Sequence, residues 1–292
     1  MHRLALLSLL VLRRATGEGG TEVKMRLRLM TILIVIPLIL LSCTTVPLTG
    51  RRQLNIIPDA TVLSMSFQQY QDFMKENKLS TNREQTEMVK RVGIKVQSAV
   101  EGYFAQKGMS GELSGYQWEF NLVESKELNA WCMPGGKVVV YSGILPVTKD
   151  EAGLAVVMGH EIAHAVAKHG NERMSQGLVT QMGGVALSKA LEAKPDQTKQ
   201  LWMAAFGVGA QVGVLLPYSR LQETEADRLG LIFMAMAGYD PHKAVDFWKR
   251  MASQQEGAGP PEFLSTHPSD ETRIQKLNEL VPEAMKYYSA KP

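Results

Sequence analysis

The sequence predicts an α+β fold that is mainly helical and contains one small β-sheet or ribbon. Apolar residues follow helical spacing over most of the chain. Between Tyr116 and Leu122 the spacing changes to two, and apolar residues alternate with polar ones as in a half-buried strand. The run KVVVY at residues 137–141 predicts a second strand, and the segment after Thr148 is helical again.

The order of elements follows from breaks in these patterns. Three glycines within residues 108–115 end the second helix, and a turn region at 129–136 separates the strands. The segment Thr148–Glu151 matches a capping box, so a helix is predicted to begin there. Helices are predicted at residues 60–76, 83–106, 148–169, 172–193, 196–215, 221–237, 241–254 and 269–280.

The N-terminal region is predicted to be a targeting segment. An apolar run at residues 29–42 follows two arginines and ends in Leu-Leu-Ser before Cys43, which resembles a bacterial lipobox. Cys43 is the expected lipidation site, with an ordinary cleaved signal or a short anchor as the alternative. Since Met25 begins a complete signal by itself, we hypothesise that translation starts there.

The charges exclude a nucleic-acid role for the body of the protein. The chain holds 32 Lys+Arg and 29 Asp+Glu. Six of these cations and two of the anions lie in residues 1–42, so residues 43–292 carry 26 cations, 27 anions and a net charge of −1. A nucleic-acid interface needs a basic face. The uncharged stretch Leu201–Pro217 predicts a buried or interface helix, with membrane contact as the alternative.

The predicted helix 148–169 contains the sequence His160-Glu161-Ile-Ala-His164. Residues four apart share a helical face, so both imidazoles can bind one metal ion. Glu161 lies one step round the helix, where it can contact a metal-bound water without being a ligand. Zinc lowers the pKa of such a water to about 7, and a carboxylate then takes its proton during attack on a substrate.

A third metal ligand is expected downstream, and Glu223 is the assigned residue. Glu223 and Asp227 are four apart and share a helical face with Gly230, where a small residue allows close approach of the two helices. Asp227 is expected to accept the N–H of a ligating histidine. Glu225 points about 200° away from Glu223. Two other histidines are expected to be ordinary ones: His169 and His242.

Together, HEIAH at residues 160–164, ETEADRLG at 223–230 and the His267-Pro268 pair with Arg273 resemble the gluzincin family of CAAX prenyl proteases and HtpX. The likeness covers about residues 50–282 and is greatest for the periplasmic BepA and LoiP branch, which is related to the mitochondrial Oma protease. It implies a zincin-like domain and a zinc endopeptidase that acts in envelope protein quality control.

The resemblance also implies roles for other residues. An edge strand within Asn129–Tyr141 would lie over the zinc and pair with an extended substrate. His267 and Arg273 would contact the substrate carbonyl or the developing oxyanion. In the BepA branch the equivalent histidine can instead cap the zinc; a catalytic role is expected for His267, with capping as the alternative. The strand residues expected to meet substrate are Asn129, Gly135, Gly136, Val138 and Val140.

The expected function is a zinc endopeptidase, with one Zn²⁺ per chain, lipid-anchored on the periplasmic face of the bacterial outer membrane. Inner-membrane anchoring is the alternative location. Its expected partners are misfolded or unassembled envelope proteins and the membrane, and no nucleic acid. Two rivals are a chaperone-like assembly factor with a mostly closed metal site and a structural zinc site. The expected organisation is a leader at 1–42, a tether at 43–58, a metallopeptidase domain at 59–285 and a tail at 286–292.

Overall fold

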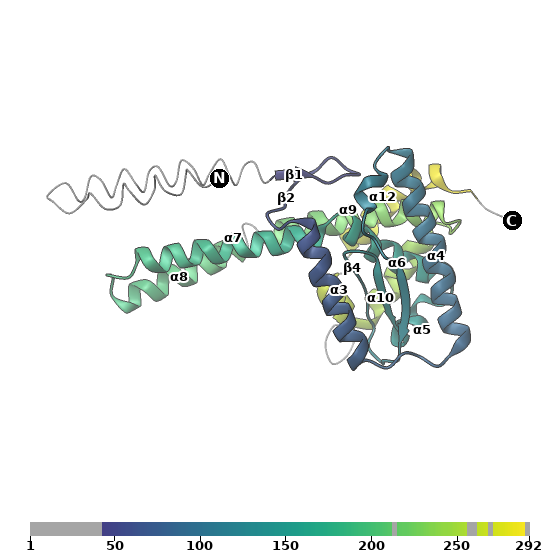
Figure 1. Cartoon of the computed structure of the whole chain (residues 1–292), viewed down its shortest axis with the longest axis horizontal. Coiled ribbons are helices and arrows are strands. Elements are labelled where there is room, and N and C mark those ends of the chain that lie inside the picture. Colours follow the sequence, from purple (N-terminus) through teal and green to yellow (C-terminus); the bar gives the residue numbers. More distant parts are fainter. Residues whose placement is uncertain (1–42, 212–214, 256–261, 268–270, 290–292) are drawn as a thin grey trace. The chain divides into compact units, whose positions relative to one another are not determined.

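The computed structural model describes residues 43–211, 215–255, 262–267 and 271–289 (Figure 1). The predicted leader at residues 1–42 lies outside these residues. The strands are β1 (Cys43–Thr45), β2 (Arg52–Leu54), β3 (Glu119–Val123), β4 (Ala130–Met133) and β5 (Lys137–Tyr141). The α-helices are α3 (Asp59–Glu76), α4 (Arg83–Gln106), α5 (Leu145–Thr148), α6 (Glu151–Val166), α7 (His169–Ala190), α8 (Asp196–Ala210), α9 (Leu216–Met236), α10 (Lys243–Ala252), α11 (Glu262–Thr266) and α12 (Glu271–Ala284). The predicted α+β class, mainly helical with a small sheet, is confirmed.

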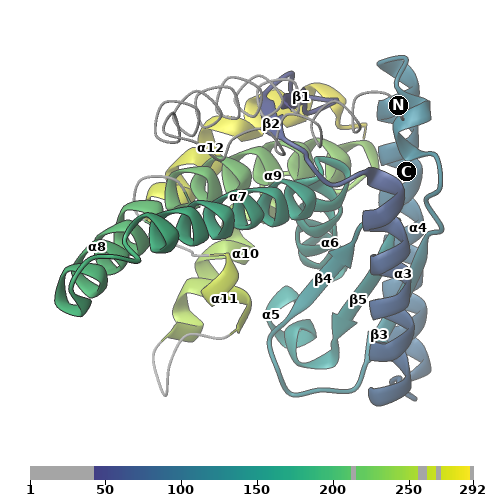
Figure 2. The same cartoon turned by 60° about the vertical axis from the view of Figure 1, so that its left-hand side comes forward.

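The central strand of a three-stranded sheet is buried on both faces. The strand order of the sheet is β3-β5-β4, and β5 runs parallel to β3 and antiparallel to β4 (Figure 2). Val138 and Val140 belong to the main core with residues of α4 and α6, whereas Val139 and Tyr141 belong to a smaller cluster with residues of α3. A strand covered on both sides has no polar face, which explains the apolar run KVVVY.

The strand order corrects one expectation about the substrate edge. β5 is the central strand, so Val138 and Val140 are paired on both sides and do not lie on an edge. The edge strands are β3 and β4, and β4 follows Asn129. Gly135 and Gly136 lie in the turn between β4 and β5 with φ of 90° and 85°. The parallel pairing of β5 with the earlier strand β3 is the cause, because it occupies the side expected to be open.

The start of α6 differs from the predicted capping box. Asp150 is the N-cap residue, and its carboxylate accepts a hydrogen bond from the Gly153 N–H at 2.8 Å. Thr148 instead ends α5, where its hydroxyl donates to the Leu145 carbonyl. Lys149 has φ of 68°, so the chain turns between the two helices at this residue and the capping side chain moves two positions along.

Helices α6 and α9 cross at two glycines. A Cβ atom at Gly159 would lie 2.9 Å from the Gly230 carbonyl oxygen, and a Cβ at Gly230 would lie 2.9 Å from the His160 nitrogen. Both distances are shorter than van der Waals contact, so the backbones touch directly. The expectation that Gly230 permits a close approach to the helix of His160 is confirmed. This crossing places the side chains of the two helices face to face.

The segment before α3 is folded onto the body, which corrects the expected tether at 43–58. Thr45–Pro292 form one compact unit. The Val46 N–H donates to the Arg51 carbonyl at 2.7 Å and closes a turn that contains Gly50, whose φ is 71°. The Ile56 N–H donates to the Ser175 hydroxyl at 3.0 Å, which joins this segment to α7. Residues 45–58 are therefore part of the domain.

Helices α7 and α8 pack side by side as a helical hairpin (Figure 1). Leu201 and Trp202 of α8 are 70% and 56% exposed, so of the two positions predicted for Leu201–Pro217, buried or at an interface, the buried one is wrong for this part of it. The interface position stays a prediction, because an apolar run does not say whether a partner covers it. None of the helices in the described ranges is both long and apolar enough to cross a membrane.

Substituting Gly230 with alanine should destabilise the protein by about 1–3 kcal/mol, because the added methyl must push α6 and α9 apart. The same change at Gly177, an exposed glycine of α7 with open space around it, should be neutral or stabilising by up to about 1 kcal/mol. Chemical denaturation of the two variants measures both effects. Equal stability of Gly230→Ala and the parent protein would contradict the close crossing.

Candidate metal centre

Four donor atoms converge where α6, α9 and the end of α11 meet. His160 Nε2 lies 3.1 Å from His164 Nε2 and 3.1 Å from His267 Nδ1. The Glu223 carboxylate lies 3.4 Å from His160 Nε2, 3.2 Å from His164 Nε2 and 2.9 Å from His267 Nδ1. These four side chains can hold one metal ion. The structure therefore brings together the three predicted ligands and adds His267.

The spacing of these donors fits zinc. Zinc binds histidine nitrogen and carboxylate oxygen at about 2.0–2.2 Å, and tetrahedral ligands at that distance lie about 3.3 Å apart. The observed separations of 2.9–3.4 Å match this value. Burial keeps the pKa of His164 well below its usual value, so its ring is neutral and can offer a lone pair. His160, His164, Glu223 and His267 would therefore hold the ion.

Asp227 fixes the outer side of His160. Its carboxylate lies 2.9 Å from His160 Nδ1 and accepts two hydrogen bonds from Arg273, at 2.9 and 2.7 Å. Burial lowers the pKa of His160, but the hydrogen bonds with Asp227 and Glu223 raise it to about 9. A metal ion competes with that proton for Nε2. The predicted contact of Asp227 with a ligating histidine is present in the structure.

Arg273 lies beside the metal cluster and holds two of its acids. Besides its paired bonds to Asp227, the guanidinium lies 3.4 Å from Glu223 Oε2 and 3.4 Å above the centre of the Trp248 ring. Such a cation over a tryptophan face is favourable, and more so in a dry site. Arg273 is the residue expected to contact a substrate carbonyl. In this structure its guanidinium is already hydrogen-bonded to Asp227.

Glu161 is buried next to the four donors but is not one of them. Its Oε1 lies 3.4 Å from His267 Nε2 and makes no hydrogen bond to any described residue. Burial raises the pKa of this carboxyl group above its usual value. A buried carboxylate with an unsatisfied oxygen costs stability, and such groups concentrate at sites of chemistry. Glu161 thus has a buried carboxylate oxygen beside the four donors that is available for a further hydrogen bond.

His267 is held by the aromatic residues beneath it. The backbone N–H of His267 donates to the Phe263 carbonyl at 2.8 Å. The centre of the Phe263 ring lies 4.9 Å from that of the His267 imidazole and 5.7 Å from that of the Trp248 ring. This packing directs Nδ1 to the metal cluster. Of the two roles considered for this residue, the structure places it where the capping role requires. Pro268 lies outside the described residues.

The outer side of His164 contacts His169, so the expectation that His169 is an ordinary histidine is wrong. His169 Nδ1 lies 2.8 Å from His164 Nδ1, and His169 Nε2 lies 3.0 Å from Glu225 Oε2. Glu225 points away from Glu223, as its helical position predicts, and so reaches the far side of His164 through His169. His242 is not part of this arrangement and pairs with Asp240 on the surface. Only the short spacing between His164 and His169 could have signalled the contact.

The edge strand β4 packs against α6. One side of β4 pairs with β5, and no strand among the described residues pairs with the other side. An extended peptide can add to such an edge through main-chain hydrogen bonds. Trp131, Cys132 and Met133 are partly exposed there. The surface available to a substrate strand is thus β4 with Asn129 before it and Gly135 after it.

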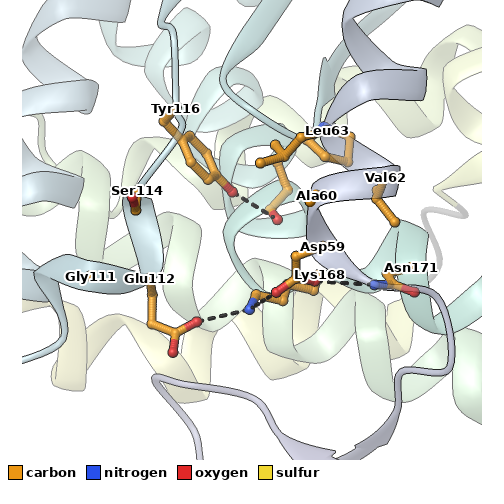
Figure 3. A pocket seen from close by; sticks show the side chains of 12 residues that line it. Asp59, Ala60, Val62, Leu63, Gly111, Glu112, Ser114, Tyr116, Lys168 and Asn171 are labelled. Carbon is orange, nitrogen blue, oxygen red and sulfur yellow. Dashed lines mark hydrogen bonds and ion pairs between the residues drawn. The ribbon is translucent and has the colours of Figure 1, made fainter. Parts of the chain in front are cut away.

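One pocket among the described residues is separate from the metal cluster. It has a volume of about 420 Å³ and is lined by α3, the segment Gly111–Tyr116 and the end of α6 (Figure 3). Lys168 crosses it and binds Asp59 and Glu112, each at 2.8 Å. The Tyr116 hydroxyl donates to the Ala165 carbonyl at 3.2 Å. None of the four donor residues lines this pocket.

Comparison with known proteins identifies similar chains. Residues 93–281 match the family described as Peptidase family M48. Mitochondrial metalloendopeptidase OMA1 of Schizosaccharomyces pombe is 35% identical over 243 residues, which cover 82% of this chain and 66% of that protein. The OMA1 metalloendopeptidase of Homo sapiens is 31% identical over 245 residues, with 82% and 46% covered. Beta-barrel assembly-enhancing protease of Escherichia coli is 29% identical over 177 residues, with 56% and 35% covered. The chain thus spans between about one third and two thirds of the length of these relatives.

Removing zinc with a chelator should lower the melting temperature by about 10 °C. Zinc at 100 to 1,000 times its dissociation constant stabilises the folded state by about 3–4 kcal/mol, and each kcal/mol shifts a domain of this size by about 2–4 °C. Thermal scans of the protein and of Glu223→Ala, with and without chelator, measure the shift. The variant lacks the carboxylate ligand and should show a smaller chelator effect; an equal effect in both proteins would contradict the ligand assignment.

Proposed function

The chain belongs to peptidase family M48, and we propose that it is a zinc-dependent endopeptidase that cleaves misfolded or unassembled proteins of the bacterial envelope. The observation that carries this proposal is the buried set of four donors with Glu161 beside it. The relatives support it by their names, metalloendopeptidase and beta-barrel assembly-enhancing protease. A pure binding site would not need the unsatisfied carboxylate of Glu161.

The residues around the donors account for peptide hydrolysis. When bound, zinc supplies a Lewis acid that polarises a carbonyl and makes water acidic near neutral pH. Glu161 would take the proton of the attacking water at Oε1 and deliver it to the leaving amide nitrogen. Asp227 keeps the His160 ring oriented by accepting its Nδ1–H, and Arg273 keeps Asp227 in place. The free side of β4 would hold the substrate in an extended conformation.

The described arrangement corresponds to a resting state of such an enzyme. A catalytic zinc site keeps one position for water or substrate, whereas four protein donors close it. Because His267 Nδ1 lies 2.9 Å from Glu223 and 3.1 Å from His160, it would hold the fourth position of a bound ion. In the proposed cycle His267 moves away when substrate pairs with β4. The same closed arrangement is the observation that favours the second candidate, a chaperone-like assembly factor.

We also propose where the enzyme acts. The lipobox-like sequence before Cys43 supports a lipid anchor on the periplasmic face of the outer membrane, with inner-membrane anchoring as the alternative. Labelled palmitate and membrane fractionation of the parent and of Cys43→Ala would distinguish an anchored protein from a released one. A structural zinc site is the less supported candidate, because closed structural sites favour cysteine ligands and this cluster has none.

Changing Glu161 to glutamine should reduce casein cleavage by at least about 100-fold while zinc content stays near one ion per chain, since the amide cannot accept the proton. Purified parent protein with and without chelator sets the active and inactive limits. Glu87→Gln, the same change at an exposed position of α4, is the control and should cleave at the parent rate. Wild-type turnover by Glu161→Gln would refute the proton-transfer role.

Changing His267 to alanine should raise basal peptidase activity severalfold, because the fourth position becomes available while three ligands remain. A quenched fluorescent peptide reports the rate, and mass spectrometry reports the zinc content. His242→Ala removes an exposed histidine and should change neither. A fall in activity with zinc retained would instead assign His267 to support of the oxyanion.

A further inference from the structure

We propose that His169, Glu225 and Arg51 position His164 for metal binding, so that the N-terminal segment at residues 45–58 is a working part of the metal centre. The inference rests on the zinc site of the proposed function and extends it to residues that touch no metal ion. It is carried by an unbroken series of short polar contacts from His164 to the turn before β2.

The first contacts in the series are buried. His169 has no exposed surface and makes a ring contact with His164, with centroids 4.8 Å apart. The two Nδ1 atoms are 2.8 Å apart, and His169 Nε2 lies 3.0 Å from the Glu225 carboxylate. Three polar side chains in such a setting are costly unless each is paired. His164, His169 and Glu225 therefore form a continuous, paired polar network.

Metal binding allows only one arrangement of protons along this series. If His164 offers Nε2 to the ion, its remaining proton is on Nδ1 and is donated to His169 Nδ1. His169 must then carry its own proton on Nε2, which points at Glu225. Each donor meets an acceptor, so the contacts select the tautomer of His164 that can bind the ion. A bound metal's histidine is usually held by its second nitrogen in this way.

Arg51 anchors the far end of the series. Its Nε donates to Glu225 at 2.8 Å, and its two terminal nitrogens donate to Glu172 at 2.9 and 2.7 Å. The Thr49 hydroxyl also donates to Glu225, and Gln222 donates to Glu172 at 2.8 Å. Both carboxylates are buried, so the guanidinium from the N-terminal segment neutralises charge that would otherwise be isolated.

The remaining contacts of this segment are made to the same part of the molecule. Asn171 donates to the Ile57 carbonyl at 2.9 Å and Lys168 binds Asp59 at 2.8 Å, next to the pocket in Figure 3. With the Ile56–Ser175 bond, these contacts fix residues 51–59 to the beginning of α7. Since α7 begins at His169, they also hold that residue against His164.

The experiment compares zinc affinity among full-length variants by competition with a chromogenic chelator. His169→Leu fills a similar space without polar atoms. It should weaken zinc binding by about 10–100-fold, as loss of the outer partner of a ligating histidine does. His169→Gln offers an acceptor and a donor and should recover most of that loss. Glu225→Gln and Arg51→Ala should weaken zinc binding by smaller factors, of about 3–10-fold.

The control is a matched ion pair from the same helix. Arg228 of α9 donates two bonds to Glu283, at 2.8 and 2.6 Å, and touches none of the metal donors. Arg228→Ala should lower stability as Arg51→Ala does but leave zinc affinity unchanged. The visible spectrum of the cobalt-substituted proteins is a second readout. It should shift for His169→Leu, whose ligand is misoriented, and stay as in the parent for Arg228→Ala.

Two results would overturn the inference. Parental zinc affinity and cobalt spectrum in His169→Leu would show that His164 needs no partner at Nδ1. Equal loss of zinc in Arg228→Ala and Arg51→Ala would make the loss a general effect of lower stability. If the parent protein itself binds no zinc, the proposed function fails together with the inference, whereas unchanged variants of a zinc-binding parent refute the inference alone.

Discussion

The backbone contact between Gly159 and Gly230 sets the geometry on which the rest of the centre depends. Two helices that touch through glycines lie closer than side chains would allow, so a histidine of α6 and a carboxylate of α9 can reach one point without long, flexible stems. The glycine on α6 directly precedes His160, and the crossing therefore fixes the first ligand most tightly. Because the interior is close-packed, any residue larger than glycine there moves the ligands themselves.

Charge is balanced around this crossing in layers. Glu161 and Asp227 bring two buried carboxyl groups to the centre and Glu223 a partly buried one, and Arg273 lies among them. A divalent ion offsets the remaining negative charge, which is why such a cluster of acids can persist in a dry interior. Outside it, His160 contacts Asp227 directly, and His164 is linked to Glu225 through His169. Each of these two acids is held by an arginine from a different part of the chain.

What the sequence could predict depended on whether the geometry was local. The ligands of α6 and α9 were identifiable because a spacing of four residues on a helix fixes a shared face without reference to the fold. The central position of β5 could not be identified from the sequence, since it depends on a parallel partner strand that comes earlier in the chain. The direction of His267 depends on packing between Phe263 and Trp248, and Arg51 lies in a turn without periodic signal. The contact of His169 required knowing how α7 turns away from α6 after Lys168, whose φ is 60°.

The long sequence separations between the ligands also set the order in which the metal centre is assembled. A ribosome makes the helix of His160 and His164 well before Glu223 and His267, and that helix alone supplies half of the donors. Contacts between distant parts of a chain form late in folding, because their loops must close first. The four-donor centre is therefore complete only when the C-terminal half has been made and packed, so an unfinished chain would lack the proposed peptidase activity against itself or its neighbours.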